Sequence, residues 1–395
     1  MKLEIGFGSC PQTVELPDET VLDVLYPNGI EAPADSAAEV ARALLSPIGT
    51  PPLAELAKGK QKVAIVTSDI TRPMPSAVVL PLVLDELYRA GVCPESVTVV
   101  FALGSHRRQT EEEKLHLAGE EVYRQVTCVD SLDFDFVHMG DTKRGTPVDI
   151  CRPVAEADLV VSVCKLKTHS MTTLSGGVKN LFGCIPGLQK PELHLRFPEK
   201  ADFGEMLVDL ALTVKPALTI VDAVVGMEGD GPSGGSPRKL GFLAACQNPF
   251  LLDLALCRII GVTPESVPTI AASQRRGLCP ESADALSFAG EVQFARPVPG
   301  FVPPHAKSVD FLSHTPRLLR PAVSRLWDHL TPRPVIRRKD CVGCGRCAES
   351  CPAHTITIVS GKAQIRYDRC IHCYCCHEMC PVRAIDIRRT RFFDL

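Results

Sequence analysis

The 395-residue sequence predicts an α/β protein with a Rossmann-like parallel sheet, in one or more domains, followed by a small cysteine-rich α+β domain. Short, continuous apolar runs such as KVAIVTS and SVTVVFALG alternate with segments of helical periodicity. Strands of this kind, buried on both faces, are typical of parallel sheets covered by helices. Nine of the eighteen cysteines lie between Cys341 and Cys380, which indicates a separate C-terminal domain.

The apolar runs predict four strands, over residues 62–68, 96–104, 157–166 and 217–227. A helix is predicted between the first two strands, over an apolar-periodic stretch that ends at Gly91. Another helix is predicted to begin near Thr110, whose hydroxyl can cap a first turn rich in glutamates. In a parallel sheet of this kind, ligands gather at the carboxyl ends of the strands.

Composition changes along the chain predict four regions. These are an N-terminal segment that packs on the α/β domain, the α/β domain, a proline-rich linker and the cysteine-rich domain, over 1–59, 60–294, 295–334 and 335–395. The net charge of -3 does not indicate binding to nucleic acid or to an anionic membrane surface. The N-terminus lacks the apolar core of a secretion signal, and no apolar run approaches the length of a membrane span. We therefore expect a cytoplasmic protein that binds neither nucleic acid nor membrane.

Polar segments follow the predicted strands. They are TSDITRP, GSHRRQT, KLKTHSMTTLSGGVKN and DAVVGMEGDGPSGG, over 67–73, 104–110, 165–180 and 222–235. Because the carboxyl ends of neighbouring parallel strands meet at one edge of a sheet, we expect these segments to form one site. Each signal alone has an ordinary explanation: an Asp-x-x-Arg pair is usually a helix cap beside a solvated arginine, and a single histidine is as often a surface residue as a ligand.

The third polar segment has the composition of an anion-binding loop. Gly176 and Gly177 allow backbone amides to face an anion, and Ser175 is predicted to cap a helix that begins near Val178. Positive charge for a phosphate or carboxylate is expected from Lys165, Lys167, Lys179 and Arg72. The alternative for the two glycines is a tight turn, which is their commonest use. The segment is neither a Walker loop nor a G-x-G-x-x-G motif, so no nucleotide is predicted.

Two stretches of the pattern C-x2-C-x2-C-x3-C-P occupy residues 341–352 and 370–381. Three thiolates at this spacing bind one cubane, and the fourth, before the proline, ligates the other cluster. We therefore assign cluster one to Cys341, Cys344, Cys347 and Cys380, and cluster two to Cys351, Cys370, Cys373 and Cys376. Cys375 lies outside this pattern and is expected not to be a ligand. A zinc site is the alternative, but one ion needs four ligands and leaves the duplicated motif unexplained.

These motifs, with a predicted strand, turn and strand between them, resemble the bacterial two-cluster ferredoxins over about 335–391. The resemblance implies a ferredoxin-like domain with two 4Fe–4S clusters that exchange single electrons with a redox partner protein or electron carrier. Gly343 and Gly345 allow backbone amides to approach the cluster sulfides, which tunes the reduction potentials. The oxygen sensitivity of such clusters suits an anaerobic setting.

Three strings of the α/β region, SDITRPMPS, ALGSHRRQTEEE and KTHSMTTLSGGVKNLFGCIPG, resemble the domain-of-unknown-function 362 proteins over roughly 60–265. More distantly, they are similar to the nickel-pincer lactate racemase superfamily. That resemblance implies that Lys179 tethers the pincer cofactor, and that His106 and His169 are the acid and base. It also implies that Asp69 and Arg72 belong to the loop at cofactor and substrate.

The sequence also departs from the racemase pattern. His194 is the only nearby candidate for the histidine that ligates nickel in the racemases. Val178 stands where the racemases commonly have arginine. Lys165 and Lys167 replace acidic or neutral residues, and the large C-terminal domain of the racemases is replaced by the linker and the cysteine-rich domain. A racemase needs no net electrons, whereas iron–sulfur clusters imply net electron transfer.

We therefore expect an iron–sulfur oxidoreductase that couples single-electron transfer to a small anionic substrate or cofactor on the α/β domain. One alternative is a non-enzymatic electron-transfer subunit, in which the α/β domain is a docking scaffold for a redox complex. Another is a pincer-cofactor racemase or epimerase whose clusters are structural. Bound nickel distinguishes the last alternative from the first two.

Overall fold

The structure, a computed structural model, describes residues 2–7, 10–15, 40, 43–44, 51–70, 74–103, 108–187, 189–232, 234–289, 295–304 and 333–388. The chain divides into two compact units, Met1–Glu31 and Ala32–Leu395. In the first unit, β1 (Lys2–Phe7) pairs antiparallel with β2 (Cys10–Glu15). Most of the predicted proline-rich linker, residues 305–332, lies outside the described part of the chain.

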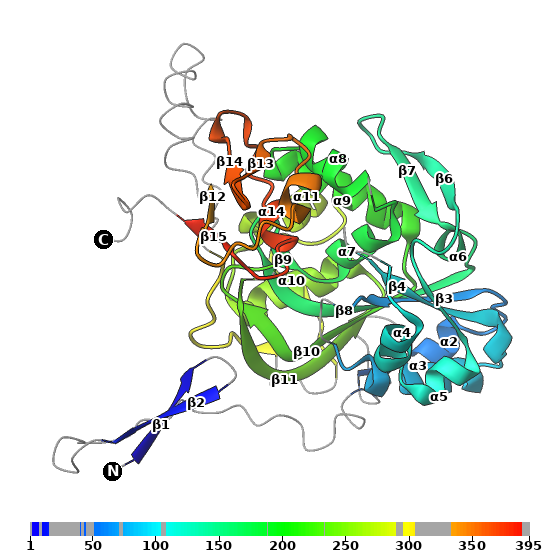
Figure 1. The fold of residues 1–395 in the computed structure, drawn as a ribbon. Helices are drawn as coiled ribbons and strands as arrows, with labels where there is room; N and C mark the ends of the chain where they lie inside the picture. The colour runs from blue at the N-terminus through cyan, green and yellow to red at the C-terminus, as the bar shows by residue number, and fades with distance from the viewer. Residues whose placement is uncertain are drawn as a thin grey trace. The chain divides into compact units, whose positions relative to one another are not determined.

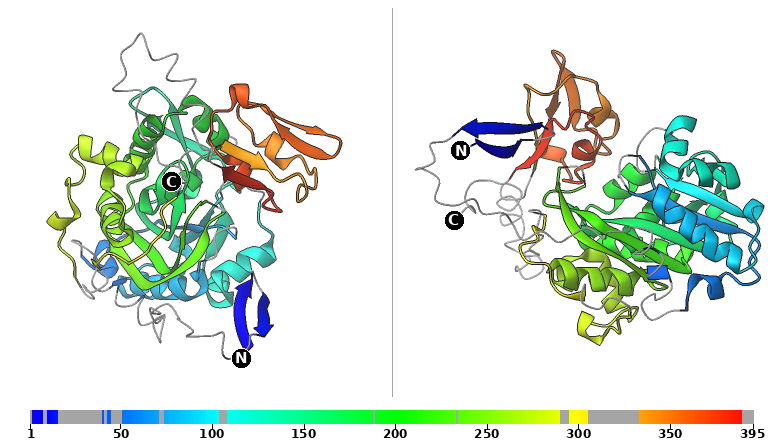
Figure 2. Two further views of the ribbon diagram at one scale, coloured as in Figure 1. Left: turned by 90° about the vertical axis from the view of Figure 1, so that its left-hand side faces the viewer. Right: turned by 90° about the horizontal axis from the view of Figure 1, so that it is seen from below.

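The second unit is built on a seven-stranded sheet, shown in Figures 1 and 2, which confirms the predicted α/β class. The strand order is β11-β10-β8-β3-β4-β5, and β9 pairs with β8. The strands are β3 (Val63–Ser68), β4 (Val97–Ala102), β5 (Thr127–Asp130), β8 (Leu159–His169), β9 (Thr173–Ser175), β10 (Leu218–Glu228) and β11 (Ser236–Cys246). The pairs β10–β8, β8–β3, β3–β4 and β4–β5 are parallel.

The chain order places a topological switch point between β3 and β8. From β3 the chain adds β4 and β5 on one side, and β8 and β10 then extend the sheet on the other side of β3. The crevice at such a switch point is where open α/β sheets bind ligands. The structure differs from a purely parallel sheet at β9 and β11, which run antiparallel to β8 and β10.

Helices cover both faces of the sheet (Figure 2), because alternate side chains of each strand enter different apolar clusters. Ile65 and Val99 pack with the helices of one face, whereas Val66 and Val100 pack with those of the other. The first face is covered by α2 (Leu53–Leu56), α3 (Ser76–Arg89), α4 (Glu111–Ala118) and α5 (Glu120–Gln125). The second is covered by α6 (Arg152–Ala155), α7 (Gly177–Asn180), α8 (Gln189–Arg196), α9 (Lys200–Val214), α10 (Pro249–Ile260) and α11 (Pro268–Arg275).

Two local features complete the α/β region. The predicted helix after Thr110 is confirmed as α4, and Thr110 and Glu113 form a reciprocal capping box. A hairpin that the sequence did not predict, β6 (Phe136–Asp141) with β7 (Pro147–Cys151), precedes β8. Within the described ranges, no helix is long and apolar enough to cross a membrane.

The cysteine-rich region forms two small antiparallel pairs, which we call the ferredoxin module (333–388). Its outer pair is β12 (Arg333–Ile336) with β15 (Ile385–Arg388), and its inner pair is β13 (Ile356–Val359) with β14 (Lys362–Ile365). The inner pair is the predicted strand, turn and strand; the turn residues Ser360 and Gly361 both have positive φ, as a type I′ hairpin requires. Two short helices, α13 (Arg346–Glu349) and α14 (Cys375–Glu378), lie within the cysteine motifs.

Candidate functional site

A cavity lies at the switch point between the ends of β3 and β8. It has about 430 Å³ of empty space, part of it open to solvent, and Ser68 of β3 lies in its wall. Of the site residues predicted from the sequence, it brings together Lys165, Lys167, His169, Ser175, Gly176 and Lys179. Gly177 and Asp69 lie outside its lining. Arg72 and His106 fall outside the described residues.

The basic residues of β8 reach the cavity because this strand continues beyond the ends of β3. Lys165 Nζ lies 2.5 Å from Asp222 Oδ2 of β10, and the Asp222 carboxylate is fully buried. The other Asp222 oxygen accepts the Val224 amide at 2.9 Å. The Lys165 ammonium is therefore oriented by the neighbouring strand. Lys167 Nζ lies 3.5 Å from the carbonyl oxygen of Pro232.

His169, the last residue of β8, is held in one orientation by backbone amides. Its Nδ1 accepts from the amides of Met171 at 3.1 Å and Thr172 at 3.4 Å, and its ring is buried. Because Nδ1 is an acceptor, the neutral ring carries its proton on Nε2. His169 can therefore present an N–H donor from Nε2 to a ligand.

Lys179 lies against aromatic rings. Its Nζ is 4.3 Å from the ring centre of Phe182 and 5.5 Å from that of Phe203. His194 packs on the same two rings, at 5.7 and 4.5 Å between centroids, and its Nδ1 is 2.7 Å from the Lys190 carbonyl oxygen. His194 is not part of the cavity wall, but it shares both aromatic neighbours with Lys179.

The glycine pair does not present its amides to an outside anion. The amides of Gly177 and Val178 donate to the Asp253 carboxylate of α10, at 2.7 and 3.2 Å. Gly176, not Ser175, is the N-cap residue of α7, and without a side chain it cannot cap the helix by a side-chain hydrogen bond. A Cβ at Gly176 would lie 2.2 Å from Asp253 Oδ1, so glycine is required here for close packing on α10. Burial raises the pKa of Asp253 to about 7.

Lys190 is a cavity residue that the sequence did not reveal. Lys190 is only 2% exposed, but its ammonium is hydrogen-bonded within the protein. Nζ donates to the carbonyl oxygens of Leu103, Ile185 and Gly183 at 2.6, 3.0 and 3.4 Å. These bonds tie α8 to the end of β4 and to the short helix η3 (Leu181–Cys184). An isolated lysine in a polar helix carries no signal for such a role.

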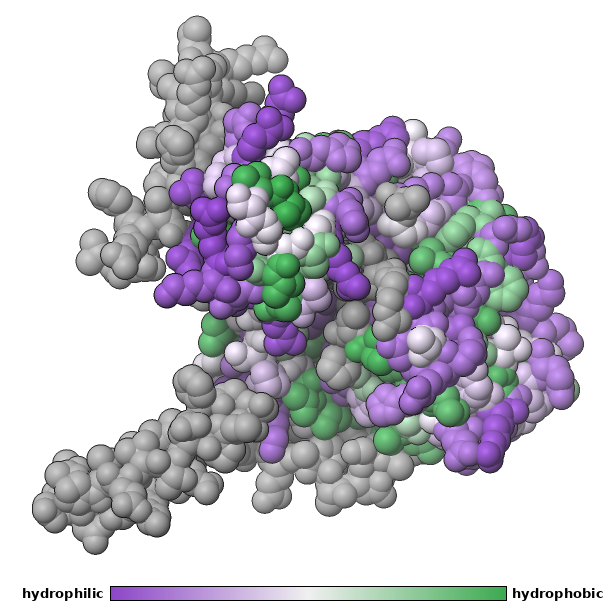
Figure 3. Space-filling model, viewed as in Figure 1, coloured by the Kyte–Doolittle hydropathy of each residue, from purple (hydrophilic) through white to green (hydrophobic). Residues whose placement is uncertain are grey.

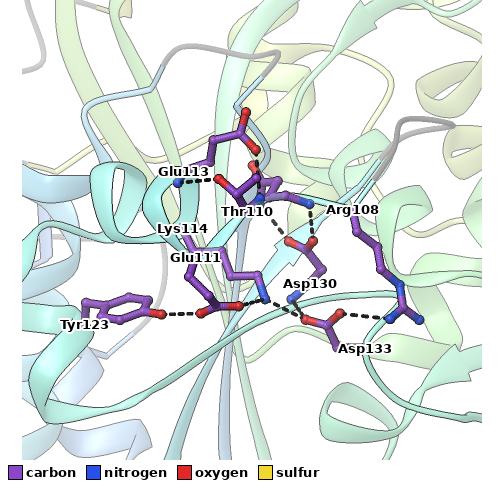
Figure 4. A network of polar contacts seen from close by, with 9 residues as sticks. Arg108, Thr110, Glu111, Glu113, Lys114, Tyr123, Asp130 and Asp133 are labelled. Carbon is purple, nitrogen blue, oxygen red and sulfur yellow. Dashed lines mark hydrogen bonds and ion pairs between the residues drawn. The ribbon is translucent and has the colours of Figure 1, made fainter.

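Gln109 is a second residue without a sequence signal. Its Oε1 accepts the Ile70 amide at 2.8 Å, while its own amide and Nε2 donate to Asp130 at 2.6 and 2.7 Å. It thus joins the segments that follow β3 and β4. Figure 4 shows that Asp130 continues into a network through Asp133 to Lys114, whose Nζ is 2.9 Å from Asp133 Oδ2.

The cysteines of the ferredoxin module gather in two groups. Cys341, Cys344, Cys347 and Cys380 line one hollow. Burial, followed by the charges of Cys373, Cys370, Cys351 and, last, Cys347 of the first group, raises the pKa of Cys376 well above its usual range. The three larger charge effects on Cys376 thus come from the other proposed ligands of cluster two. The proposed ligand sets are therefore compatible with the fold.

Backbone amides point at the sulfur atoms of the module. The amides of Ala384, Thr355 and Ala363 donate to Sγ of Cys380, Cys351 and Cys341 at 3.1, 3.3 and 3.4 Å. The Ala363 amide, and to a lesser degree Gly343, lowers the pKa of Cys341. Hydrogen bonds of this kind stabilise thiolates, the form that ligates iron.

The hollow lined by Cys341, Cys344, Cys347 and Cys380 is compatible with a bound cubane. Among the residues that the structure describes, no three or more His, Cys, Asp or Glu side chains converge to hold one metal ion. Zinc requires thiolates at about 2.3 Å around a single point. Sulfurs spread around a hollow leave space for a cluster between them.

Comparison with known proteins covers both regions. Residues 7–192 match the model of the lactate racemase N-terminal domain, and residues 333–381 match that of the 4Fe-4S dicluster domain. The matches confirm the resemblance to lactate racemases and to two-cluster ferredoxins.

Two relatives illustrate how far these likenesses extend. A thylakoid-associated protein of Synechocystis sp. is 42% identical over 140 residues, which are 35% of this chain and 43% of that protein. The lactate racemase of Thermoanaerobacterium thermosaccharolyticum is 33% identical over 192 residues, 47% of this chain and 45% of that protein. The solved apoprotein of that racemase has a TM-score of 0.49 at 26% identity, covering 64% of this chain and 61% of its own. The chain thus spans under half the length of these curated relatives.

Proposed function

We propose that this chain is an iron–sulfur oxidoreductase. It carries a lactate racemase N-terminal domain and a 4Fe-4S dicluster domain. The cavity at the switch point binds a small anionic substrate or cofactor, and the ferredoxin module exchanges single electrons with it. Each 4Fe–4S cluster, when bound, supplies or accepts one electron at a time. The proposed ligands are the two groups of four cysteines described above.

The observation that carries this proposal is the charge of the cavity wall. Four lysines line it, Lys165, Lys167, Lys179 and Lys190, and the described lining contains no aspartate or glutamate, although Lys165 is paired with Asp222 behind the wall. A concave, partly buried site lined by one sign of charge concentrates ligands of the opposite sign. A carboxylate or phosphate is therefore the class of group that the cavity favours.

Different residues of the cavity would make different contacts with such a ligand. Lys165, oriented by Asp222, presents a positive charge from β8. His169 presents its Nε2–H, because its Nδ1 is occupied by backbone amides. A donor at this position can stabilise negative charge on a ligand oxygen, or deliver a proton to it as an electron arrives.

A pincer-type racemase or epimerase is the second candidate, and the match to the lactate racemase N-terminal domain favours it. Lys179 and His169 line the same cavity, as a cofactor tethered on the lysine beside an acid or base would require. His194 packs on the rings that contact Lys179, so a metal ligand from α8 would be close by. Such a cofactor would supply a hydride acceptor; the residues fit its tether, and its presence would give Lys179 a covalent role.

Anaerobic purification followed by metal analysis and anion-binding calorimetry tests the proposal. We expect about eight irons per chain for two 4Fe–4S clusters, no nickel, and binding of phosphate or lactate that weakens at least about tenfold, or about 1.4 kcal/mol, in Lys179→Ala. The matched control is Lys62→Ala, which removes an exposed lysine paired with Glu156. Equal binding by wild type and Lys179→Ala would oppose the proposal. Stoichiometric nickel, or an adduct mass on Lys179, would favour the second candidate.

A further inference from the structure

The turn that connects β10 to β11 packs on the cavity end of β8. The amide and the hydroxyl of Ser170 both donate to the Gly231 carbonyl oxygen, at 3.0 and 2.6 Å. A Cβ at Gly231 would lie 1.9 Å from the Thr168 carbonyl oxygen, so only glycine allows this approach. Lys167 of the cavity wall reaches the Pro232 carbonyl oxygen of the same turn. The turn is therefore part of the wall structure of the site.

The same turn contacts the ferredoxin module. A Cβ at Gly234 would lie 2.8 Å from Cε1 and 3.0 Å from Nε2 of His377, so the turn backbone lies directly against this ring. His377 belongs to α14, its ring is buried, and its Nδ1 is 2.5 Å from the Ile385 carbonyl oxygen. The helix α14 contains Cys376 and directly follows Cys373, two of the proposed ligands of cluster two.

Asp230 is an acidic residue of the same turn. A Cβ at Gly234 would lie 3.0 Å from the Asp230 carbonyl oxygen and equally close to His377 Nε2, so Asp230 and the ring from α14 both lie beside Gly234. The negative charge of Asp230 is therefore expected to act on the environment of cluster two.

Cluster one has a different environment. Its ligand Cys344 is exposed, and its hollow is rimmed by Val342, Ile358 and Val382, which are 63%, 39% and 42% exposed. Figure 3 shows apolar side chains grouped among hydrophilic ones on the surface over β13 and β14. An exposed apolar rim around a redox centre suits contact with a carrier protein.

We propose that the two clusters act in a fixed order, with cluster two facing the cavity through the β10–β11 turn and cluster one facing an external one-electron carrier. This inference rests on the proposed function, because it assumes that a ligand in the cavity exchanges electrons with the module. In the reducing direction, a cluster held by Cys341, Cys344, Cys347 and Cys380 would accept one electron from the carrier, which is thereby oxidised. A cluster held by Cys351, Cys370, Cys373 and Cys376 would then receive this electron and pass it to the ligand. A two-electron reduction needs two such transfers, with protons supplied through His169 or solvent.

The contact between Gly234 and His377 is the part of this arrangement that a mutation can remove without touching a ligand cysteine. Any side chain at Gly234 must displace the His377 ring or the turn, since the Cβ alone approaches within 3.0 Å. Gly234→Val should therefore separate the turn from α14 while both clusters remain bound. Asp230→Asn removes the charge but keeps the shape.

Anaerobic redox titration of the full chain, followed by electron paramagnetic resonance, tests the order. We expect Asp230→Asn to raise the potential of one cluster only, while Val342→Asp lowers that of the other and so assigns the two signals. Phosphate as the cavity probe should shift the signal that responds to Asp230→Asn. Gly234→Val should abolish this shift with iron content unchanged. The control is Asp135→Asn, which removes the charge of a side chain that is 90% exposed.

Three outcomes separate this inference from the proposed function. If both clusters respond equally to Asp230→Asn, or neither responds, the order is wrong. If phosphate binds by calorimetry but shifts the cluster assigned by Val342→Asp, the order is reversed and the proposed function stands. If phosphate does not bind at all, the proposed function fails first, and the effect of Asp230→Asn alone decides whether the turn faces cluster two.

Discussion

The ferredoxin module and the α/β region relate their candidate sites to their hydrophobic cores in opposite ways. The buried apolar cluster of the module has eight members, and four of them are proposed ligands: Cys341, Cys347, Cys351 and Cys376. The cavity lysines, by contrast, belong to neither of the two large apolar clusters that flank the sheet. In the module half of the core consists of proposed ligands, whereas in the α/β region only Cys164 and Phe182 of the cavity lining belong to an apolar cluster.

This difference has a thermodynamic consequence. A small domain that cannot bury enough apolar surface depends on its cofactor for folding, and metal binding then becomes folding free energy. The α/β region has long buried strands and helices on both faces, so its stability does not depend on a ligand in the cavity. Loss of a cofactor ligand should therefore unfold one region and spare the other.

The largest expected effect is on the module. Cys376→Ser removes a proposed ligand that is 7% exposed, and we expect about four irons to be lost, together with protection of residues 333–388 from proteolysis. The α/β region should keep its thermal transition. Iron analysis and limited proteolysis measure the two effects.

Cys375→Ser provides the matched control, because Cys375 is also buried and belongs to the same helix, but lies outside the repeated motif. It should retain about eight irons. Equal loss of iron in both variants would contradict the proposed ligand set. Equal loss of the α/β transition in Cys376→Ser would contradict the independence of the two regions.

The two regions also differ in how much their sequences reveal. The module can be recognised from local spacing, because three proposed ligands of each cluster lie within seven residues. The predicted strand, turn and strand also agrees with β13 and β14. In the α/β region, apolar runs identify β3, β4, β8 and β10, and the geometry of parallel strands places Lys165, Lys167, His169 and Lys179 at one cavity.

What the sequence could not reveal depends on partners that are distant along the chain. Asp253 meets the Gly177 amide across 76 residues, and Lys190 meets the Leu103 carbonyl across 87. Neither pair has a local sequence pattern. The Gly-Gly motif therefore suggested that the amides bind an external anion, whereas they bind the Asp253 carboxylate of the chain itself. The antiparallel return of β11 also depends on tertiary packing, because its apolar pattern alone does not indicate strand direction.

Asp253 gives the next largest expected effect, a dependence of stability on pH. This effect tests whether the amides at the start of α7 have a structural role. Burial raises its pKa in the folded chain to about 7, while the unfolded carboxyl titrates near 3.8. Between these values the folded state retains a proton that the unfolded state has lost. The free energy of unfolding should therefore fall as the pH rises from about 4 to about 7, by up to roughly 4 kcal/mol.

Asp253→Asn cannot titrate, so this fall should disappear, while the remaining amide oxygen can still accept from α7. Urea unfolding followed by circular dichroism at several pH values measures the difference in slope from wild type. Asp135→Asn, at an exposed site, should leave the slope unchanged. A wild-type slope in Asp253→Asn would show that other groups cause the pH dependence.

Lys190 and Lys179 test whether one cavity contains a structural and a functional lysine. Lys190→Met leaves three carbonyl oxygens without their donor, and we expect it to lower the free energy of unfolding by about 3 kcal/mol. Lys179→Met loses the contacts of its ammonium with two rings, worth about 1 kcal/mol. Denaturant unfolding and phosphate calorimetry should thus rank the variants in opposite orders, and the same order in both assays would remove the distinction.

Gln109 gives the smallest effect and sharpens the comparison within the α/β region itself. Gln109→Ala leaves the Ile70 amide without its acceptor and removes the Nε2 donor from Asp130, while the backbone amide of residue 109 can still donate, with an expected cost of about 1–2 kcal/mol. Because burial already raises the pKa of Asp130 and the side-chain bond from Gln109 opposes that shift, the variant should raise this pKa further. Hydrogen exchange should increase in the segments after β3 and β4, whereas Gln125→Ala, at an exposed helix position, should leave both protected. Unchanged exchange in Gln109→Ala would mean that the neighbouring packing, not this side chain, joins the two strand ends at the cavity.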